Sequence, residues 1–437
     1  MSEYTKKTKE LIVGFVKENE KLVNKIVPNV IIQIIIMFVP NWIIFGVGWN
    51  NKGQFGLSHF NDLKKIEKLN EFSLLDPVNI YVQTTCFMVQ SLRSEIFFCG
   101  RLGGENDNAI NKFKKLSFND QNIENNNIII SNGYASAHCI LAVYDYSNHF
   151  KLQIFGIGDD SCYQCGVDDN NQTFCKQPTF LTETTKYFET LVITQIETGG
   201  RHTLFLTNNG LVHALGDNEY CQCGINYDND NNNKLIKSPK IIQSLSNVNI
   251  IKICCGEDHN LCLDSNNKLW GFGKHKLGQI GIKNNDNSNH IKIPTMNAYL
   301  KNAMIEQIQC GSHHSMVIDN VKNCYLFGLN IYGQIGIHQV FIPHLIQSID
   351  SMKGISIRSG SLGNHHTLLL SESNQIISFG NNTYNQCSSI NKSNRIFSPY
   401  LLSNNEINNN SNFLINKVIA GFCFSIQIKI ILTIKLI

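Results

Sequence analysis

The sequence predicts an all-β fold: a seven-bladed β-propeller of four-stranded antiparallel blades, with a short N-terminal helical segment. Three observations support this prediction. A glycine followed closely by a Gly-Gln-apolar-Gly tetrad recurs along the chain. The copies lie 52 to 58 residues apart, a period that suits one four-stranded sheet per repeat and exceeds that of helical hairpins. In four copies, a histidine stands fourteen residues before the leading glycine.

The glycine repeat varies in clarity along the chain. The segments GWNNKGQFG, GKHKLGQIG and GLNIYGQIG are the clearest copies, two others keep the frame with substitutions, and the copies at Gly100 and Gly380 are weaker. The leading glycines are Gly48, Gly100, Gly158, Gly216, Gly273, Gly328 and Gly380. Their even spacing indicates a repeat protein in which each copy marks one blade.

A second motif, glycine and two residues followed by histidine, precedes the leading glycine in most units. Cys86 and Phe424 stand at the histidine position in the first and last units, and His138 lies twenty residues before Gly158 because a polar hairpin tip is inserted. Such insertions are tolerated, since loop closure costs little more as the loop lengthens. The regular histidines are His202, His259, His314 and His366.

The residues between histidine and glycine alternate between apolar and polar as half-buried strands do. Each unit is therefore predicted to hold a strand after a polar loop, a second strand that ends before the histidine motif, and a hairpin that ends at the glycine. In the fourth unit the predicted strands are Lys240–Leu245, Ile250–Cys255, Asn260–Asp264 and Lys268–Phe272.

Together the tetrad and the histidine motif resemble the regulator of chromosome condensation repeat family, from about Trp42 to the C-terminus. The resemblance implies a seven-bladed propeller. It also implies either guanine nucleotide exchange on a small GTPase, as in the founding member of the family, or a role as a protein-binding module. Trp-Asp and kelch propellers fit less well, because no Trp-Asp dipeptide occurs and their periods are shorter.

We expect the repeated residues to be structural, with no catalytic, cofactor-binding or metal-binding site among them. Equivalent residues of a ring lie far apart, whereas the ligands of one metal ion must converge. Each histidine is expected to make a local hydrogen bond that fixes its blade, and the glutamines to bond between blades. The predicted structural positions include the glutamines Gln54, Gln279 and Gln334, the four regular histidines, and every leading glycine except Gly100.

The fifteen cysteines suggest metal or redox chemistry at first sight. However, Cys165, Cys223 and Cys387 occupy the apolar position of the tetrad, where Phe55 and Ile280 stand in other copies. We therefore interpret them as small buried hydrophobes. Their scattered arrangement favours a reducing compartment, and we expect a cytoplasmic protein, with the nucleus as the alternative.

The predicted domains are an N-terminal segment, residues 1–41, and a propeller, residues 42–437. Met1–Lys25 has the pattern of an amphipathic helix, and the apolar stretch Val30–Val39 is too short to span a membrane and too far into the chain for a signal peptide. We expect an apolar segment that covers an end or face of the propeller. Ile26–Pro40 is also similar to the opening of an F-box, which would imply a ubiquitin-ligase adaptor, and membrane association is a further alternative.

The two ends of the chain compete for one place in the ring. Trp42–Val47 and Ile431–Ile437 could each supply the last strand of the blade that begins near Asn416. Because propellers close by mixing strands from both ends, which removes free sheet edges, we predict that Trp42–Val47 completes this blade.

Charge and motifs limit the function classes. The net charge is only +3 and there are five arginines, so we expect no direct nucleic-acid binding. No hydrolase, zinc-protease or nucleotide-binding loop motif occurs. We predict a monomeric, non-enzymatic scaffold or adaptor that binds another protein. The first alternative is an exchange factor or regulator of a small GTPase, and the second is an F-box-like adaptor of a ubiquitin ligase.

Overall fold

The computed structural model describes residues 41–431 with gaps. The predicted N-terminal helix, the apolar stretch and the F-box-like segment fall on residues 1–40, outside the described residues. The last six residues, 432–437, are also outside them. The internal gaps are 53, 56, 71–74, 76, 83–85, 92–93, 102–108, 119–126, 132–137, 146–150, 168–173, 227–233, 284–287, 338–339, 389, 403–413 and 422–423.

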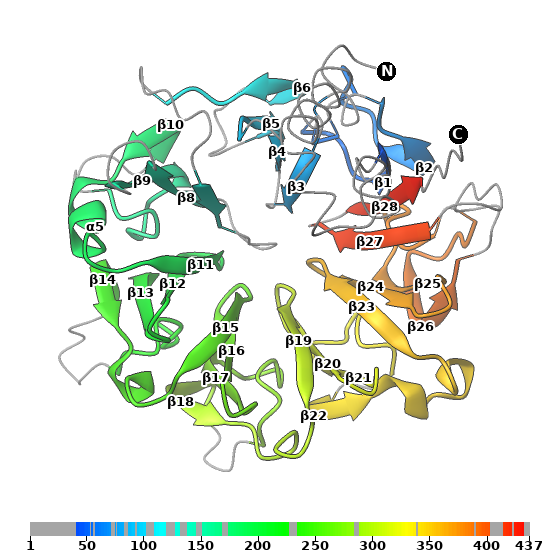
Figure 1. The fold of residues 1–437 in the computed structure, drawn as a ribbon. Coiled ribbons are helices and arrows are strands. Elements are labelled where there is room, and N and C mark those ends of the chain that lie inside the picture. The colour runs from blue at the N-terminus through cyan, green and yellow to red at the C-terminus, as the bar shows by residue number, and fades with distance from the viewer. Residues whose placement is uncertain are drawn as a thin grey trace, which may run out of the picture.

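The described strands form four-stranded antiparallel sheets arranged in a ring (Figure 1). Six of these blades are each built from four consecutive strands. Blades 1 to 3 are β3 (Pro77–Val82), β4 (Cys86–Ser91), β5 (Ile96–Gly100) and β6 (Ile110–Lys115); β7 (Asn127–Ile130), β8 (His138–Asp145), β9 (Lys151–Asp159) and β10 (Phe174–Phe180); and β11 (Ile193–Thr198), β12 (His202–Thr207), β13 (Val212–Asp217) and β14 (Leu235–Ile241).

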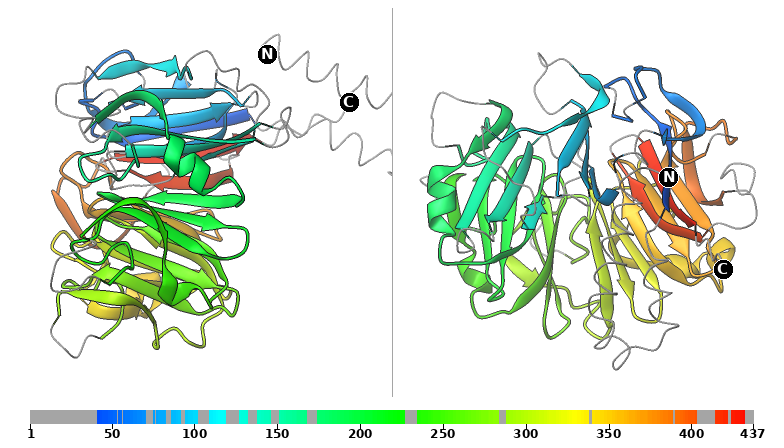
Figure 2. Two further views of the ribbon diagram at one scale, coloured as in Figure 1. Left: turned by 90° about the vertical axis from the view of Figure 1, so that its left-hand side faces the viewer. Right: turned by 45° about the horizontal axis from the view of Figure 1, so that its top comes forward.

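The next three blades follow the same order from the centre of the ring outward. Blades 4 to 6 are β15 (Ile250–Cys255), β16 (His259–Asp264), β17 (Leu269–Lys274) and β18 (His290–Met296); β19 (Ile305–Cys310), β20 (His314–Asp319), β21 (Cys324–Gly328) and β22 (Val340–Leu345); and β23 (Ile357–Leu362), β24 (His366–Ser371), β25 (Ile376–Asn381) and β26 (Arg395–Leu401). Figures 1 and 2 show the first strand of each blade near the axis and the fourth at the rim.

A composite blade closes the ring from both ends of the chain. Its strand order is β2 (Leu63–Lys68), β1 (Asn41–Gly48), β28 (Phe424–Ile431) and β27 (Leu414–Ala420). Strand β1 pairs antiparallel with β28 along its whole length, from Asn41 opposite Ile431 to Gly48 opposite Phe424. The prediction that Trp42–Val47 completes this blade is confirmed, and the ring has no free strand at this junction.

The fold class predicted from the sequence needs correction. Six blades are contiguous in the sequence, and the seventh sheet exists only where the two ends of the chain meet. The helical structure of the described residues is one short helix, α5 (Thr182–Tyr187), and three 3-10 turns, and the predicted N-terminal helical segment lies outside the described residues. Helix α5 forms between β10 and β11, where Glu183 in its first turn and Lys186 in its last turn both complement the helix dipole.

The predicted division into strands is wrong for the outermost strand. Lys240–Leu245 was expected to open a blade, but Lys240 and Ile241 end β14 at the rim of the preceding blade, and Gln243–Leu245 forms a 3-10 turn. The fourth strand instead follows the tetrad. In β14 only Ile236 and Pro239 are buried, so this edge strand shows little apolar alternation, and its proline is tolerated because it lies at the edge.

The register explains the fixed spacing seen in the sequence. In each of the sheets, the residue at the histidine position lies directly opposite the leading glycine, as with His202 and Gly216. Cys86 faces Gly100, and Phe424 faces Gly48, in the same way. His138 faces Gly158 despite the inserted residues between them, because the longer strands β8 and β9 absorb most of the insertion.

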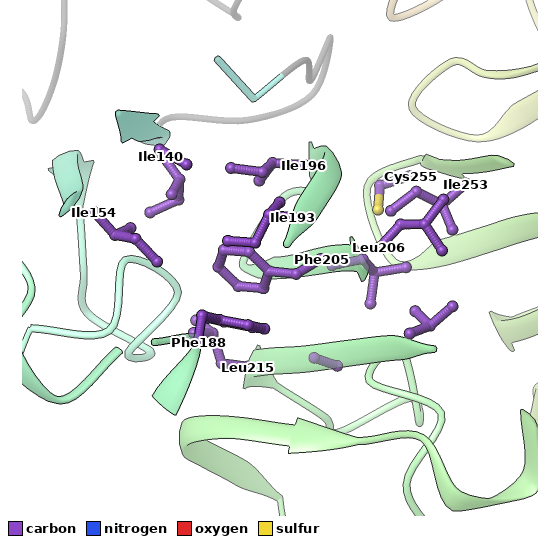
Figure 3. Packing of buried hydrophobic residues seen from close by; sticks show 14 of the residues in the cluster. Ile140, Ile154, Phe188, Ile193, Ile196, Phe205, Leu206, Leu215, Ile253 and Cys255 are labelled. Carbon is purple, nitrogen blue, oxygen red and sulfur yellow. The ribbon is translucent and has the colours of Figure 1, made fainter. Parts of the chain in front are cut away.

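Apolar side chains fill the space between neighbouring blades. The largest cluster joins blades 2, 3 and 4, and Figure 3 shows Phe205 and Phe188 packed between Ile154 of blade 2 and Leu206 of blade 3. Large buried rings contribute most to such interfaces, since each removes a large apolar area from water. The core therefore lies between blades instead of at one centre.

A separate aromatic cluster holds the closure of the ring. Phe424 of β28, Phe87 of β4 and Phe55 of the loop after β1 are all fully buried. The Phe424 ring lies 4.8 Å from that of Phe87 and 5.5 Å from that of Phe55, measured between centroids. This cluster connects the composite blade to blade 1.

Replacing the central ring of this cluster should weaken closure. Because Phe424 is fully buried, Phe424→Ala is expected to lower the free energy of unfolding by about 3–5 kcal/mol. Phe397→Ala is the control, since Phe397 is 56% exposed and its loss should cost under about 0.5 kcal/mol. Urea unfolding followed by tryptophan fluorescence measures both, and equal effects would contradict a closing role for the cluster.

Candidate functional site

The repeated residues build one kind of junction between neighbouring blades. The imidazole Nε2 of each histidine meets a polar side chain on the second strand of the next blade. The distances are 2.9 Å from His138 to Thr203, 2.7 Å from His202 to Asn260, 2.8 Å from His259 to Ser315, 3.1 Å from His314 to Thr367 and 3.2 Å from His366 to Ser425.

The same polar side chain donates to the backbone carbonyl of the tetrad glutamine. Thr203 Oγ1 donates to Gln164 O at 2.7 Å, and Ser315 Oγ donates to Gln279 O at the same distance. Since the hydroxyl proton is used in this bond, the histidine Nε2 must carry the proton in the other. Each histidine is thus a neutral Nε2–H tautomer, and a relay runs from histidine to hydroxyl or amide to glutamine carbonyl.

Burial keeps these imidazoles neutral. It lowers the pKa of His138 and of His366 to about 3, and that of His259 and His314 well below the ordinary value. The ring of His259 also covers Gly256 so closely that a Cβ there would lie 2.1 Å from Cε1. The glycine of the histidine motif is therefore required by the imidazole that packs on it.

The glutamine side chain acts inside its own loop. Gln279 Oε1 accepts from the backbone N–H of Leu277 at 2.8 Å, and Gln334 Oε1 accepts from that of Tyr332 at 3.0 Å. Gln54 does the same with Lys52 at 3.1 Å, and its Nε2 donates to the Trp49 carbonyl. The expected roles need correction: the histidines reach the next blade, while the glutamine side chains bond locally and only their carbonyls are shared between blades.

The leading glycines share a backbone conformation that other residues rarely adopt. The φ angles lie between +98° and +115° at Gly48, Gly100, Gly158, Gly216, Gly273, Gly328 and Gly380. At Gly273, an added Cβ would lie 2.5 Å from the carbonyl oxygen of Asp258. Each tetrad loop can therefore approach the histidine turn beside it only through a glycine.

Sequence reasoning missed one residue of the frame, two positions after the leading glycine. Asn50 Oδ1 accepts from the N–H of Phe55 at 3.0 Å, and Asn330 Oδ1 accepts from that of Ile335 at 2.9 Å. Asp160, Asn218 and Asn382 make the equivalent bond, and His275 makes it through Nδ1. The sequence did contain a signal for this role, because Asn or Asp recurs at the second residue after the leading glycine. Both residue types close turns by bonding to the backbone through their side chains.

The cysteines of the tetrads are buried, as the sequence predicted from their apolar position. Cys165, Cys223 and Cys387 are buried in the same place as Phe55 and Ile280. Among the described residues, no group of three or more His, Cys, Asp or Glu side chains could hold a metal ion. In the same part of the chain, no helix is long and apolar enough to cross a membrane.

A cavity of about 230 Å³ lies at the centre of the ring. The first strands of blades 3 to 6 and of the composite blade line it, with Gln195, Glu197, Lys252, Cys254, Gln307 and Lys417 among the lining residues. Gln195 spans two blades, because its amide donates to the Ile253 carbonyl at 2.9 Å and its Oε1 accepts from the Ile253 N–H at 3.1 Å. Gln307 donates in the same way to Gly360 O at 2.9 Å.

Glu197 is the one carboxylate among the described lining residues of this cavity. Burial raises its pKa to about 8, although a hydrogen bond from Gln195 Nε2, at 2.9 Å, and the nearby Lys252 oppose the shift. At neutral pH this carboxyl group is mostly protonated. A lone carboxyl group with no histidine beside it in the described lining does not form an acid–base pair for catalysis.

Removing one histidine should break one inter-blade relay. In His259→Ala, the hydroxyl of Ser315 and the covered glycine lose their partner, so the free energy of unfolding should fall by about 2–3 kcal/mol. His344→Ala serves as the control, because His344 is only half-buried and bonds within its own blade to Ser348. Urea unfolding at pH 7.5 measures both. A loss no larger than that of the control would show that the relay does not hold the blades.

Glu197 should make stability depend on pH. Its pKa rises from about 4.5 in the unfolded chain to about 8 in the folded protein, so its contribution is present below pH 4.5 and is lost as pH rises through 8. Glu197→Gln keeps an acceptor for Gln195 and removes the titration. The variant should therefore gain stability relative to the wild type between pH 5 and pH 8. Parallel urea unfolding curves at each pH test this, and a constant difference would contradict it.

Parts of this chain match known repeats and known proteins. A sequence model described as "Regulator of chromosome condensation (RCC1) repeat" matches residues 209–263 and 266–318, and a second model of the same repeat matches 193–222, 250–279 and 357–386. Human "Protein RCC2" is 26% identical over 204 residues, which are 41% of this chain and 37% of that protein. Rat "Probable E3 ubiquitin-protein ligase HERC4" is 34% identical over 143 residues, 32% of this chain and 13% of that protein.

Two solved structures show the same fold. Prp20p from Saccharomyces cerevisiae superimposes with a TM-score of 0.74 at 18% identity, covering 90% of this chain and 92% of that one. Human WBSCR16 superimposes with a TM-score of 0.69 at 16% identity, covering 89% and 98%. The chain spans less than two fifths of the curated relatives named above. These matches show that the chain carries regulator of chromosome condensation (RCC1) repeats over residues 193–318 and 357–386.

Proposed function

We propose that this chain is a non-enzymatic propeller that binds another protein through the face on which its tetrad loops lie. In an antiparallel blade, the turn between the first and second strands and the loop between the third and fourth strands lie at the same end. The Asp217 N–H, which donates to the Arg201 carbonyl at 2.8 Å, joins these two segments in blade 3. We call this end, with its tetrad loops and histidine turns, the tetrad face.

A row of half-buried aromatic side chains on the tetrad face carries the proposal. Each stands in a tetrad loop of a different blade, and all are partly accessible to a partner: Trp49, Tyr163, Tyr220, Tyr332 and Tyr384. Tyrosine, tryptophan and arginine supply much of the binding energy at protein interfaces, since each offers a large rigid contact area at a small entropy cost.

Cations from the next blade stack on three of these rings. Lys237 Nζ lies 4.8 Å from the centroid of Tyr163, Lys274 Nζ lies 4.3 Å from that of Tyr220, and Arg395 Cζ lies 4.9 Å from that of Tyr332. Such cation–π contacts hold both side chains in place before a partner arrives. A surface that is ordered in advance loses less entropy on binding.

Polar side chains connect the aromatic row across blades 4, 5 and 6. The His313 Nε2 lies 3.3 Å from Glu257 Oε2, and the His313 ring lies 6.3 Å from that of His365. The His365 ring packs against Tyr332 with centroids 4.7 Å apart, and burial lowers its pKa to about 4. At neutral pH the His365 ring is therefore uncharged and, with Tyr332, forms an aromatic area of the face. Charged side chains such as Glu257 and Arg395 lie around this area, as is typical of a protein interface.

The identity of the partner is a separate question from the binding face. Prp20p has binding properties toward Gsp1p and histones, and yeast RCC1 (Prp20) has also been solved with Kap60 bound to it. We test small GTPases first, because exchange activity is the alternative function that the family resemblance implies.

The F-box-like alternative concerns residues 26–40 and remains a sequence prediction. The proposed domains remain residues 1–41 and 42–437, and cytoplasmic or nuclear location and a monomeric state also remain predictions.

A double substitution on the tetrad face should remove binding. Tyr332→Ala with Arg395→Ala deletes one stacked pair, and we expect partner affinity to fall at least about tenfold, equivalent to about 1.4 kcal/mol. Met304→Ala with Val321→Ala is the control, because these residues are 58% and 66% exposed at hairpins and connections on the opposite end. Quantitative co-purification with the tagged wild type, double variant and control chains measures the loss, after circular dichroism has verified folding.

Two outcomes would contradict the proposal. If the control substitutions abolish association and the tetrad-face substitutions do not, the opposite end binds the partner. If the purified chain accelerates GDP release from a member of a panel of small GTPases, the exchange-factor alternative replaces the scaffold. In that case the Tyr332 and Arg395 double variant shows whether the tetrad face contacts the GTPase.

A further inference from the structure

The wall of the central cavity contains two thiols that touch across a blade boundary. Cys254 lies on β15, the first strand of blade 4, and Cys310 lies on β19, the first strand of blade 5. Their Sγ atoms are 3.0 Å apart, although the residues are separated by 56 positions in the sequence. Both are free cysteines, and both line the cavity.

The contact arises from the way in which neighbouring first strands pack. The residue two positions before the motif glycine in one blade meets the residue just before the glycine in the next. At the junction of blade 6 with the composite blade, the corresponding pair is Ser361 and Ala420, where the Ala420 N–H donates to Ser361 Oγ at 2.9 Å. At the junction of blades 3 and 4 the pair is Glu197 and Cys255. Only at the junction of blades 4 and 5, among the described junctions, do both positions carry sulfur.

We propose that Cys254 and Cys310 are a site of disulfide formation that covalently joins the first strands of blades 4 and 5 in the wall of the central cavity. A disulfide has its sulfurs about 2.05 Å apart, so the two thiols need to approach by about 1 Å. Neither strand has to change its register for this approach, because the two sulfur atoms already lie next to each other.

The cavity gives a small oxidant access to the pair. Its volume of about 230 Å³ is several times the roughly 30 Å³ that a water molecule occupies in the liquid. Hydrogen peroxide is little larger than water and fits in this volume. Cys254 is 6% exposed and Cys310 is 1% exposed, so Cys254 is the more accessible of the two.

The chemistry balances with hydrogen peroxide as the two-electron oxidant. The Cys254 thiol loses its proton, the thiolate attacks one peroxide oxygen, and the O–O bond breaks to leave Cys254 as a sulfenic acid. The hydroxide that departs takes up the proton from the Cys254 thiol and becomes the first water. The Cys310 sulfur then attacks the Cys254 sulfur, forming the S–S bond and breaking the S–O bond, and the displaced hydroxide takes the Cys310 proton to leave as a second water. The two thiols lose two electrons and the peroxide gains them.

Burial sets the rate of this reaction. It raises the pKa of the Cys254 thiol well above its usual range, with the Cys310 thiol adding to the shift and Lys252 opposing it. Since the thiolate is the nucleophile, oxidation should be slow at neutral pH and should accelerate as pH rises. The site therefore responds to sustained oxidation and not to brief exposure.

Peptide mapping of the full-length wild-type protein tests the proposal directly. The folded protein is treated with hydrogen peroxide, free thiols are alkylated in denaturant, and the chain is digested with trypsin. Cys310 is the single cysteine of the peptide 302–322, and Cys254 lies in the peptide 253–268 with Cys255 and Cys262. We expect these two peptides to appear linked, with two hydrogens fewer than their sum, and to separate when dithiothreitol is added. Fragmentation of the linked pair identifies which cysteine of 253–268 is joined.

Single substitutions provide the matched controls. Cys254→Ser and Cys310→Ser should each abolish the linked peptide. Cys255→Ser should retain it, because adjacent residues on a strand point to opposite faces and it is the Cys254 sulfur that meets Cys310. In the wild type, the oxidised form should unfold at a higher urea concentration than the reduced form, since the link closes a long loop in the unfolded chain.

Three results would overturn the inference. The first is a wild-type protein whose Cys254 or Cys310 becomes sulfinic acid without any linked peptide. The second is complete recovery of both thiols in alkylated form after prolonged peroxide treatment at pH 8.5. The third is a linked peptide that fragmentation assigns to Cys255 or Cys262. Each can be read from the wild-type digest, so the outcome does not depend on the folding of a variant.

Discussion

The structure depends on one repeated interaction, the hydrogen-bond relay that crosses each of five blade boundaries from imidazole to hydroxyl or amide to glutamine carbonyl. A blade of four short strands cannot bury enough apolar area by itself. The stability of a blade comes from its packing against the blade on each side. The relay fixes the distance and the relative rotation of the two neighbouring blades. Because every partner in the relay is buried and satisfied at Nε2, a shifted blade would leave polar groups without partners in an apolar interface. The relay thus specifies the ring as well as stabilising it.

The first and last units show what replaces the relay where the ring closes. Phe424 stands at the histidine position, and it packs on Gly421 as His259 packs on Gly256. Its ring meets Phe55 and Phe87 and bonds to no polar partner there, so closure is held by aromatic burial and by the ladder between β1 and β28. The strands at this boundary come from opposite ends of the chain, and the apolar contacts that join them are non-directional, unlike the hydrogen bonds of the relay.

Since the repeated residues are occupied in holding the blades, function is left to side chains that the frame does not use. The tetrad face presents aromatics and cations that vary from blade to blade, and the central cavity presents Glu197, Lys252 and the thiols of Cys254 and Cys310. These two surfaces are chemically different. The tetrad face offers contact area suited to a protein, and the central cavity offers a small space lined by an ionisable carboxyl group and two thiols.

The sequence by itself determined the repeat frame, the resemblance to the repeat family and the composite closure. Glycine at positive φ, the fixed histidine spacing and the apolar alternation are local requirements, so they recur at the same position of every repeat. It also revealed that the tetrad cysteines fill apolar positions. Only the tertiary structure decided which side chains cross a blade boundary, since His259 and Gln279 both recur at fixed spacing but just one of their side chains reaches the next blade. The sequence also did not reveal the contact of Cys254 with Cys310. The two cysteines stand at different positions of the repeat, on strands that become neighbours only in the assembled ring.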